Sequence, residues 1–312
     1  MSEAGVVPST KRTGSGVVAI WIRAVRAPSL TAAAMPVLLG GAVAARAGYF
    51  SFFRLLLALL GSLAIQAGTN LINDYYDHEK GSDSADSLGP SLVIQQGLLS
   101  ATEVWWGGIA AFGIGAALGL LLVKLCGWPI LLIGIPSIAA GYFYTAAPFS
   151  LAYAGLGELT VFIFMGPVIV LGAYYVSALS FSSTALVASI PVGFLVAGIL
   201  HANNIRDIDS DRLHGKRTLA TILGRAAANY ELAALDLAAY ATVIVAVWFR
   251  ALPWTVLFTL ITARRALDQL RIVFKNTEAK RLNLALFRSV QLHMEFGLLM
   301  ILAFLIALPF AW

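Results

Sequence analysis

Long apolar runs recur along the chain and are separated by short polar stretches. Because a helix needs about 20 apolar residues to cross roughly 30 Å of hydrocarbon, runs of this length indicate transmembrane helices. The pattern predicts an all-α polytopic membrane protein in which nine transmembrane helices surround a central cavity and helical cytoplasmic loops form a cap. The nine runs cover residues 28–48, 51–72, 102–123, 126–145, 157–178, 182–204, 227–249, 252–271 and 290–311.

Two segments depart from this regular pattern. Residues 1–16 are small and polar, so we expect a flexible N-terminal tail ahead of a single domain over 17–312. The eighth apolar run is interrupted near its end by Arg264, Arg265 and Asp268. An interfacial helix that leaves the bilayer early is therefore an alternative to a full crossing at this run.

Composition supports the membrane interpretation. The 312 residues are 59% hydrophobic and 12% charged, whereas soluble domains carry about 25% charged residues. We expect the lipid bilayer to surround the protein, and we expect neither a nucleic-acid partner nor an obligatory protein partner. With the N-terminus in the cytoplasm, 17 of the 21 basic residues lie on the cytoplasmic side and 4 on the opposite side. This bias predicts a multi-pass protein of the plasma (inner) membrane with a cytoplasmic N-terminus.

Acidic residues gather in two clusters, one after the second apolar run and one after the sixth. The first cluster contains Asp74, Asp77, Glu79, Asp83 and Asp86, and the second contains Asp207, Asp209 and Asp211. Four crossings separate the clusters, and an even number returns the chain to the same side. Asn73 and Asp77 are four residues apart, as are Asp207 and Asp211, so each pair shares one helix face. Both clusters are therefore expected to face one cytoplasmic cavity.

These residue types predict a site for a metal-bound diphosphate. Carboxylates that face each other across a cavity repel unless cations lie between them. Oxygen ligands without accompanying His or Cys suit Mg²⁺, which bridges carboxylates to phosphate oxygens. Arg206, Lys216 and Arg217 would offer positive charge to the same anion. Solvated loops are the alternative for either cluster alone, but two clusters on one side favour the diphosphate site.

The motifs themselves resemble those of a known family. NDYYD followed by GSD, and NNIRDIDSD followed by GKRT, are similar to the two aspartate-rich motifs of the UbiA superfamily of intramembrane prenyltransferases. The family pattern is N-D-x-x-D-x-x-x-D. Asn73, Asp74 and Asp77 match it, but Gly81 occupies the last position and the acid follows as Asp83. That departure, together with YTAAPFSLAYAGLGEL, resembles the branch that prenylates 1,4-dihydroxy-2-naphthoate in menaquinone synthesis.

The resemblance implies a reaction and a set of site residues. The implied activity is Mg²⁺-dependent transfer of a polyprenyl chain from polyprenyl diphosphate to an aromatic acceptor. That acceptor would be 1,4-dihydroxy-2-naphthoate, giving demethylmenaquinone, or alternatively another ring such as 4-hydroxybenzoate or homogentisate. Two Mg²⁺ ions would be held by Asn73, Asp77, Asp207 and Asp211. The catalytic candidates are Asp77, Asp207, Asp211 and Tyr144, and the substrate-binding candidates are Asn70, Asp74, Asp83, Tyr142, Asn203, Arg206, Lys216 and Arg217.

Several polar residues near the motifs have two open interpretations. Tyr142, Tyr144, Tyr75 and Tyr76 could line a dry cation site or could belong to an interfacial aromatic belt. Glu158 is either a helix-start acid or part of the site, and His201 is either a hydrogen-bonded packing residue or a functional group within the sixth run.

Other classes of membrane protein fit the pattern less well. A cation-coupled transporter would place its acids in the middle of membrane helices, whereas these acids lie clustered at helix ends beside basic residues. The D-G-x-x-A-R string of CDP-alcohol phosphotransferases does not occur. A non-catalytic scaffold would have no use for two motifs of metal-ligand type.

Overall fold

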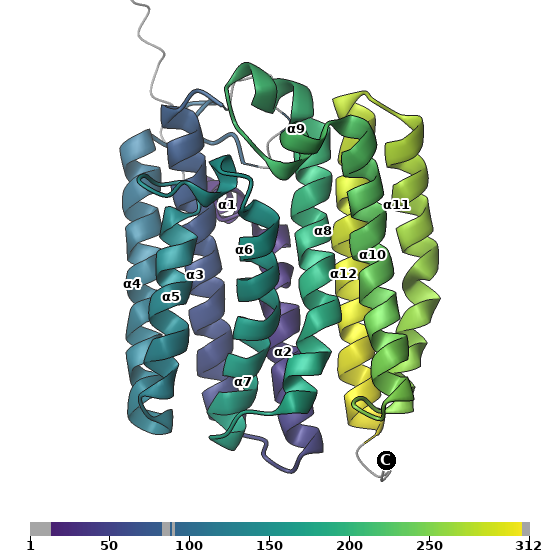
Figure 1. The fold of residues 1–312 in the computed structure, drawn as a ribbon. Coiled ribbons are helices and arrows are strands. Elements are labelled where there is room, and N and C mark those ends of the chain that lie inside the picture. Colours follow the sequence, from purple (N-terminus) through teal and green to yellow (C-terminus); the bar gives the residue numbers. More distant parts are fainter. Residues whose placement is uncertain (1–13, 83–87, 89–90, 308–312) are drawn as a thin grey trace, which may run out of the picture.

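The computed structural model describes residues 14–82, 88 and 91–307, so the predicted site residue Asp83 and most of the predicted tail lie outside it. In this part of the chain all regular elements are helical, and they stand side by side as a bundle (Figure 1). The helices are α1 Gly14–Ala24, η1 Ala27–Leu30, α2 Thr31–Arg46, α3 Phe52–Glu79, α4 Ala101–Cys126, α5 Pro129–Phe143, η2 Leu151–Tyr153, α6 Gly157–Ile163, η3 Phe164–Val168, α7 Ile169–Ala178, α8 Ser183–Leu213, α9 Leu219–Leu223, α10 Arg225–Trp248, η4 Trp254–Thr262, α11 Ala263–Lys275 and α12 Ala279–Ile306.

Seven helices of the described chain are long and apolar enough to cross a membrane. Helix α5 is apolar but has only 15 residues. The eighth predicted run consists of the 3₁₀ helix η4 followed by the charged helix α11, and it is not among the seven. The structure therefore confirms an all-helical protein with several membrane-spanning helices, while the predicted number of nine stays a prediction.

The helices that carry the acidic clusters extend further than the apolar runs predict. Helix α3 continues to Glu79 and helix α8 to Leu213, so Asp77 and Asp211 are helical residues rather than loop residues. Apolar periodicity ends where a helix leaves the hydrocarbon, but backbone hydrogen bonding continues into the polar region. Both motifs consequently lie on rigid helices, with their spacing of four residues on one face.

Close helix contacts depend on glycine where α3 meets α4. A Cβ atom on Gly68 would lie 3.1 Å from the carbonyl oxygen of Gly108, and one on Gly115 would lie 3.3 Å from that of Gly61. Small residues at such crossings let two backbones approach closely, which is a common basis of helix association in membranes. This pair of helices forms one wall of the bundle (Figure 1).

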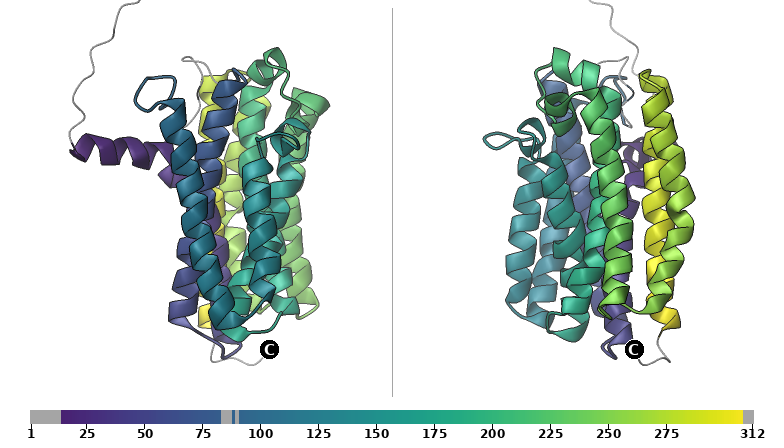
Figure 2. Two further views of the ribbon diagram at one scale, coloured as in Figure 1. Left: turned by 90° about the vertical axis from the view of Figure 1, so that its left-hand side faces the viewer. Right: turned by 45° about the vertical axis from the view of Figure 1, so that its right-hand side comes forward.

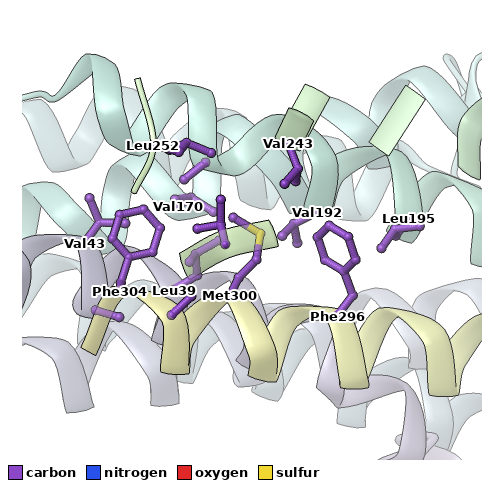
Figure 3. Close-up of a cluster of buried hydrophobic side chains, with 14 of the residues drawn as sticks. Leu39, Val43, Val170, Val192, Leu195, Val243, Leu252, Phe296, Met300 and Phe304 are labelled. Atoms are coloured by element: carbon purple, nitrogen blue, oxygen red, sulfur yellow. The ribbon is translucent and has the colours of Figure 1, made fainter. Parts of the chain in front are cut away.

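A separate apolar core holds the other side of the bundle together. Leu39 of α2, Val192 of α8, Val243 of α10 and Phe296 of α12 are fully buried there (Figure 3). Because these side chains come from helices far apart in sequence, the core fixes α8 and α12 relative to α2. These three helices also line the cavity described below.

The first helix lies outside the bundle. Helix α1 runs across the direction of the other helices (Figure 2). It joins the bundle at its C-terminal end, where Trp21 packs on Gly107 and the Arg23 guanidinium donates to Gln96 Oε1 at 2.9 Å. Its side chains include Ala19, Ile22 and Arg23 on the cavity wall, so α1 borders the mouth of the cavity.

Candidate active site

A cavity of about 1230 Å³ lies between the helices and joins a polar end to an apolar interior. The carboxylates of its wall come from α3 and α8, and Lys216 comes from the segment after α8, at the end of the bundle where α9 lies (Figure 1). Deeper residues are small or aliphatic, such as Gly119, Ile133 and Met165. A ligand with a charged head and a long apolar chain matches this division.

Asp77 is the most connected carboxylate of the first motif. Its Oδ1 accepts a hydrogen bond from the Tyr153 hydroxyl at 2.7 Å, and its Oδ2 accepts one from Asn73 Nδ2 at 3.0 Å. The Lys216 ammonium lies 3.6 Å from the same Oδ2. Asp77 is 5% exposed and lines the cavity. Its carboxylate is therefore fixed by protein contacts at the cavity wall rather than surrounded by solvent.

Tyr153 stands between two lysines beside Asp77. The Lys80 ammonium lies 3.8 Å from the centre of its ring and the Lys216 ammonium 5.1 Å. Lys80 also donates to the Thr145 carbonyl at 2.7 Å. Partial burial lowers the pKa of the Lys80 ammonium, which the Asp77 carboxylate opposes. Cation–π contacts of this kind hold positive charge near an anion site.

The sequence interpretation did not select Tyr153 or Lys80. Tyr153 lies in YTAAPFSLAYAGLGEL, outside either aspartate motif, and Lys80 was counted only as a basic residue of the cytoplasmic side. The signal that would have found Lys80 is its position three residues after Asp77, at the end of the same helix. No local pattern identifies Tyr153, because its contact spans 76 residues of sequence.

Replacing Tyr153 with Phe removes one hydrogen bond to Asp77 and keeps the ring between the lysines. We expect kcat/KM for the prenyl transfer that the sequence predicts to fall roughly 10- to 100-fold, because a hydrogen bond to a charged group contributes about 1.5–3 kcal/mol. Tyr240→Phe is the matched control, since the Tyr240 hydroxyl contacts Thr262 at 2.8 Å, away from the cavity. Steady-state kinetics on purified protein would measure both, and equal activities of the two variants would contradict the role of Tyr153.

Asp74 and Asn70 contact the chain segment that precedes α2. Asp74 is 4% exposed and pairs with Arg26, and it is not part of the cavity wall. Asn70 Nδ2 donates to the Val25 carbonyl at 2.9 Å and to Ser29 Oγ at 3.0 Å. Asn70 does line the cavity. The two side chains thus fasten the α1–α2 connection to α3.

The second motif is organised around a buried arginine. The Arg206 guanidinium, 4% exposed, forks onto Asp207 with contacts of 2.7 and 2.6 Å. It also donates to Asn203 Oδ1 at 2.9 Å and to Asn283 Oδ1 of α12 at 2.8 Å. Arg206 lines the cavity and makes four hydrogen bonds to protein groups, and its predicted contact with substrate stays a prediction. Asn283, which sequence reasoning missed, ties the motif to α12.

Asp211 differs from Asp77 and Asp207 because one oxygen of its carboxylate has no hydrogen-bond partner. Within the described residues, Asp211 Oδ2 is buried without a hydrogen bond. The carboxylate interacts electrostatically with Asp77, Asp207 and Lys216, so the two motifs act on one another across the cavity. The backbone bridge between Ala154 and Arg217 joins the adjoining loops at the same end. Among the described residues, the structure thus brings Asp77 of the first cluster and Asp207 and Asp211 of the second onto the wall of one cavity.

Not every predicted residue reaches the cavity. Arg217 is exposed and outside the cavity wall, and the Tyr142 hydroxyl lies 3.2 Å from that of Tyr76, also outside the wall. Of the four candidate tyrosines, Tyr144 lines the cavity. Lys216 lines it as well, beside Asp77. Fewer of the predicted residues therefore line the polar end of the cavity than the sequence motifs suggest.

The donor set fits Mg²⁺ shared with a substrate. Among the described residues, no three His, Cys, Asp or Glu side chains converge as a metal site by themselves. Mg²⁺ is commonly held by one or two carboxylates together with substrate phosphates and water, rather than by an all-protein cage. Asp211 with its unpartnered buried oxygen, and Asp77 on the opposite wall, are such carboxylates.

These features define a class of protein. An all-helical membrane bundle encloses a cavity whose polar end carries carboxylates and lysines and whose interior is apolar. A cavity so lined matches an amphipathic ligand with a charged head and an apolar chain. The comparisons with known proteins place the chain within this class.

The chain belongs to the UbiA prenyltransferase family, which matches residues 33–292, and it is a prenyltransferase. It is 32% identical over 284 residues to 1,4-dihydroxy-2-naphthoate octaprenyltransferase of Bacillus subtilis, covering 90% of this chain and 91% of that protein. The protein of the same name from Mycobacterium tuberculosis is 35% identical over 236 residues, covering 76% of this chain and 80% of that protein.

Solved structures show the same fold. A UbiA homolog from Aeropyrum pernix superposes with a TM-score of 0.67 at 21% identity, covering 87% of this chain and 97% of that one. A UbiA homolog from Archaeoglobus fulgidus bound to GPP and Mg²⁺ gives a TM-score of 0.64 at 19% identity, covering 90% and 99%. The predicted family resemblance is thereby confirmed.

Proposed function

We propose that this protein transfers a polyprenyl chain from polyprenyl diphosphate to 1,4-dihydroxy-2-naphthoate. The observation that carries the proposal is the cavity in which the two aspartate motifs meet above an apolar interior. Relatives that cover most of the chain at 32% and 35% identity bear the name of that naphthoate prenyltransferase, which supports the choice of acceptor.

Two Mg²⁺ ions would be held by Asn73, Asp77, Asp207 and Asp211. When bound it would supply positive charge to the diphosphate as this group leaves. Lys216, and Lys80 next to it, add positive charge at the same end. Arg206 keeps Asp207 and Asn203 in place through its fork.

The organic reaction follows from the substrates. The allylic C–O bond breaks, the electron pair leaves with diphosphate, and the ring carbon of the naphthoate attacks the allylic carbon. Loss of the ring carboxylate as CO₂ restores the aromatic ring and gives demethylmenaquinol, the reduced form of demethylmenaquinone. The apolar cavity wall excludes water, which would otherwise capture the allylic cation. Tyr144 on that wall offers a π face to the cation.

We extend the proposal to the membrane arrangement. Nine crossings follow if α5 and the η4–α11 segment cross together with the seven long helices. The 17-to-4 distribution of basic residues supports a cytoplasmic polar end in the plasma membrane, with the α9 region as its cap. The chain would work without an obligatory protein partner.

The proposed function is tested with purified protein, Mg²⁺, a polyprenyl diphosphate and a panel of aromatic acceptors. We expect diphosphate release coupled to a prenylated naphthalene product from 1,4-dihydroxy-2-naphthoate. Preferential turnover of 4-hydroxybenzoate or homogentisate would reassign the acceptor. Failure to prenylate any aromatic ring would contradict the proposal.

A further inference from the structure

A buried polar network lies behind the cavity wall, deeper than the aspartate motifs. His201 Nδ1 lies 2.8 Å from Glu158 Oε1, and Asn204 Nδ2 donates to the same oxygen at 2.9 Å. The exposed fractions of Glu158, His201 and Asn204 are 5%, 0% and 5%. Buried polar groups are costly unless they are hydrogen-bonded, so a network of this kind specifies fixed orientations.

His201 anchors this network from the side away from the cavity. Its Nε2 lies 2.9 Å from the Ala228 carbonyl, so both ring nitrogens face acceptors. Only the doubly protonated ring donates from both nitrogens. The ring thus links Glu158 of α6 to the Ala228 carbonyl of α10, and the Glu158 carboxylate in turn accepts a hydrogen bond from Asn204.

The orientation of Asn204 leaves a hydrogen-bond acceptor facing the cavity. An amide has one donor end and one acceptor end. Because its Nδ2 donates to the Glu158 carboxylate, the Oδ1 of Asn204 is the end of the amide that is left for another partner. Asn204 lines the cavity, and within the described residues no group donates to this oxygen.

Asn204 also lies at the depth where an aromatic ring would be placed. It precedes Asp207 by three residues and Asp211 by seven, so all three share one face of α8. At about 1.5 Å per residue, Asn204 lies roughly 10 Å below Asp211 along the helix, toward the apolar interior. The diphosphate would lie at the acids, with the reacting carbon and the ring just below.

We infer that Asn204 Oδ1 accepts a hydrogen bond from a ring hydroxyl of the aromatic acceptor, with Glu158 and His201 as positioning residues. The inference rests on the proposed function and identifies the acceptor subsite within it. The chemistry of the two substrates selects the partner: a metal-bound diphosphate offers only acceptor oxygens, and a polyprenyl chain offers no polar hydrogen. A phenolic hydroxyl is the donor that these substrates supply.

Asn204→Leu tests the contact, because Leu keeps the branching of the side chain and removes the oxygen together with the Nδ2 donor to Glu158. We expect KM for 1,4-dihydroxy-2-naphthoate to rise at least roughly tenfold, since discarding a hydrogen bond in a buried site has effects of this size. KM for the polyprenyl diphosphate should stay within about twofold, because that substrate does not use Asn204. Asn229→Leu is the matched control: Asn229 is a buried amide that donates to the Val273 carbonyl, outside the cavity wall.

The positioning residues are tested separately. Glu158→Gln keeps an oxygen that can accept from both His201 and Asn204, so it should retain a nearly normal KM for the naphthoate. Glu158→Leu removes that acceptor and frees the amide of Asn204 to rotate, so it should raise the same KM as Asn204→Leu does. Equal behaviour of the Gln and Leu variants would overturn the positioning role.

Methylated acceptors test the same hydrogen bond in the wild-type protein, where the folding of a variant plays no part. The two mono-O-methyl ethers of 1,4-dihydroxy-2-naphthoate each lack one hydroxyl donor. Wild-type protein should use one ether much less well than the parent acceptor, and Asn204→Leu should lose that discrimination. Unchanged discrimination, or an unchanged naphthoate KM, in Asn204→Leu would overturn the inference. Absence of prenyl transfer by the wild-type protein would instead refute the proposed function.

Discussion

Asp211→Asn is expected to eliminate most prenyl transfer without weakening the fold. We expect kcat/KM to fall roughly 100- to 1000-fold or more, the scale on which losing one transition-state charge contact acts. The change removes one of the carboxylates proposed to hold Mg²⁺. Steady-state turnover of polyprenyl diphosphate and naphthoate measures the effect.

The melting temperature of Asp211→Asn distinguishes a functional role of Asp211 from a structural one. Asp211 is 7% exposed, and its Oδ2 has no hydrogen-bond partner among the described residues. Asp207 on the same helix and Asp77 on α3 both repel its carboxylate. Burying an incompletely paired charge is costly, so Asn should leave the melting temperature unchanged or higher. Functional sites are where such unfavourable groups are retained.

Asp209→Asn is the matched control for Asp211→Asn. Asp209 lies two residues before Asp211 on α8 and also borders the cavity, but its side chain is largely exposed and pairs with Arg225 of α10 at 2.8 Å. Its substitution should leave turnover nearly normal. Full activity of Asp211→Asn, or a marked fall in its melting temperature, would contradict a metal-binding role for Asp211.

Removal of divalent cations is expected to abolish turnover completely and reversibly. Without them, Asp77, Asp207 and Asp211 present negative charge to a negatively charged diphosphate, and Lys80 and Lys216 alone do not offset it. EDTA should therefore silence the protein, and excess Mg²⁺ should restore the rate. EDTA that is already saturated with Mg²⁺ is the control for effects of the chelator itself, and activity that persists in free EDTA would contradict the mechanism.

The sequence predicted those parts of the site that depend on local geometry. A spacing of four residues placed Asn73 with Asp77 and Asp207 with Asp211 on single helix faces, and both segments are helical. The even number of crossings between the clusters correctly predicted that they share one end of the bundle. Helix ends were harder, because polar residues beyond the bilayer continue α3 and α8 without apolar periodicity.

Contacts between distant segments could not be predicted. The sequence predicted a phosphate contact for Arg206, but it did not predict the fork onto the adjacent Asp207 or the hydrogen bond to Asn283, 77 residues away. Tyr153 reaches Asp77 because the loop before α6 packs over the polar end, where Gly155 adopts a positive φ of 73°. Glu158 and His201, each with two interpretations in the sequence, become one network only when α6 packs on α8.

Some residues of the first motif region make structural contacts instead of lying among the acids. Asn70 and Asp74 belong to the first motif region by sequence, yet they fasten the α1–α2 connection through Ser29 and Arg26. Their substitution should therefore affect the mouth of the cavity rather than the diphosphate end. A motif thus combines residues for binding with residues that shape the entrance.

The central claim is that the two aspartate motifs bind one Mg²⁺–diphosphate group jointly. Calorimetric titration of the full-length protein with a polyprenyl thiolodiphosphate, which resists ionisation, tests it most directly. Wild-type protein should bind this ligand only with Mg²⁺, and Asp77→Asn and Asp211→Asn should each weaken binding by about 100-fold, since breaking a buried charge contact costs about 2–5 kcal/mol. Wild-type affinity in either single variant would show that one motif suffices and would contradict the account.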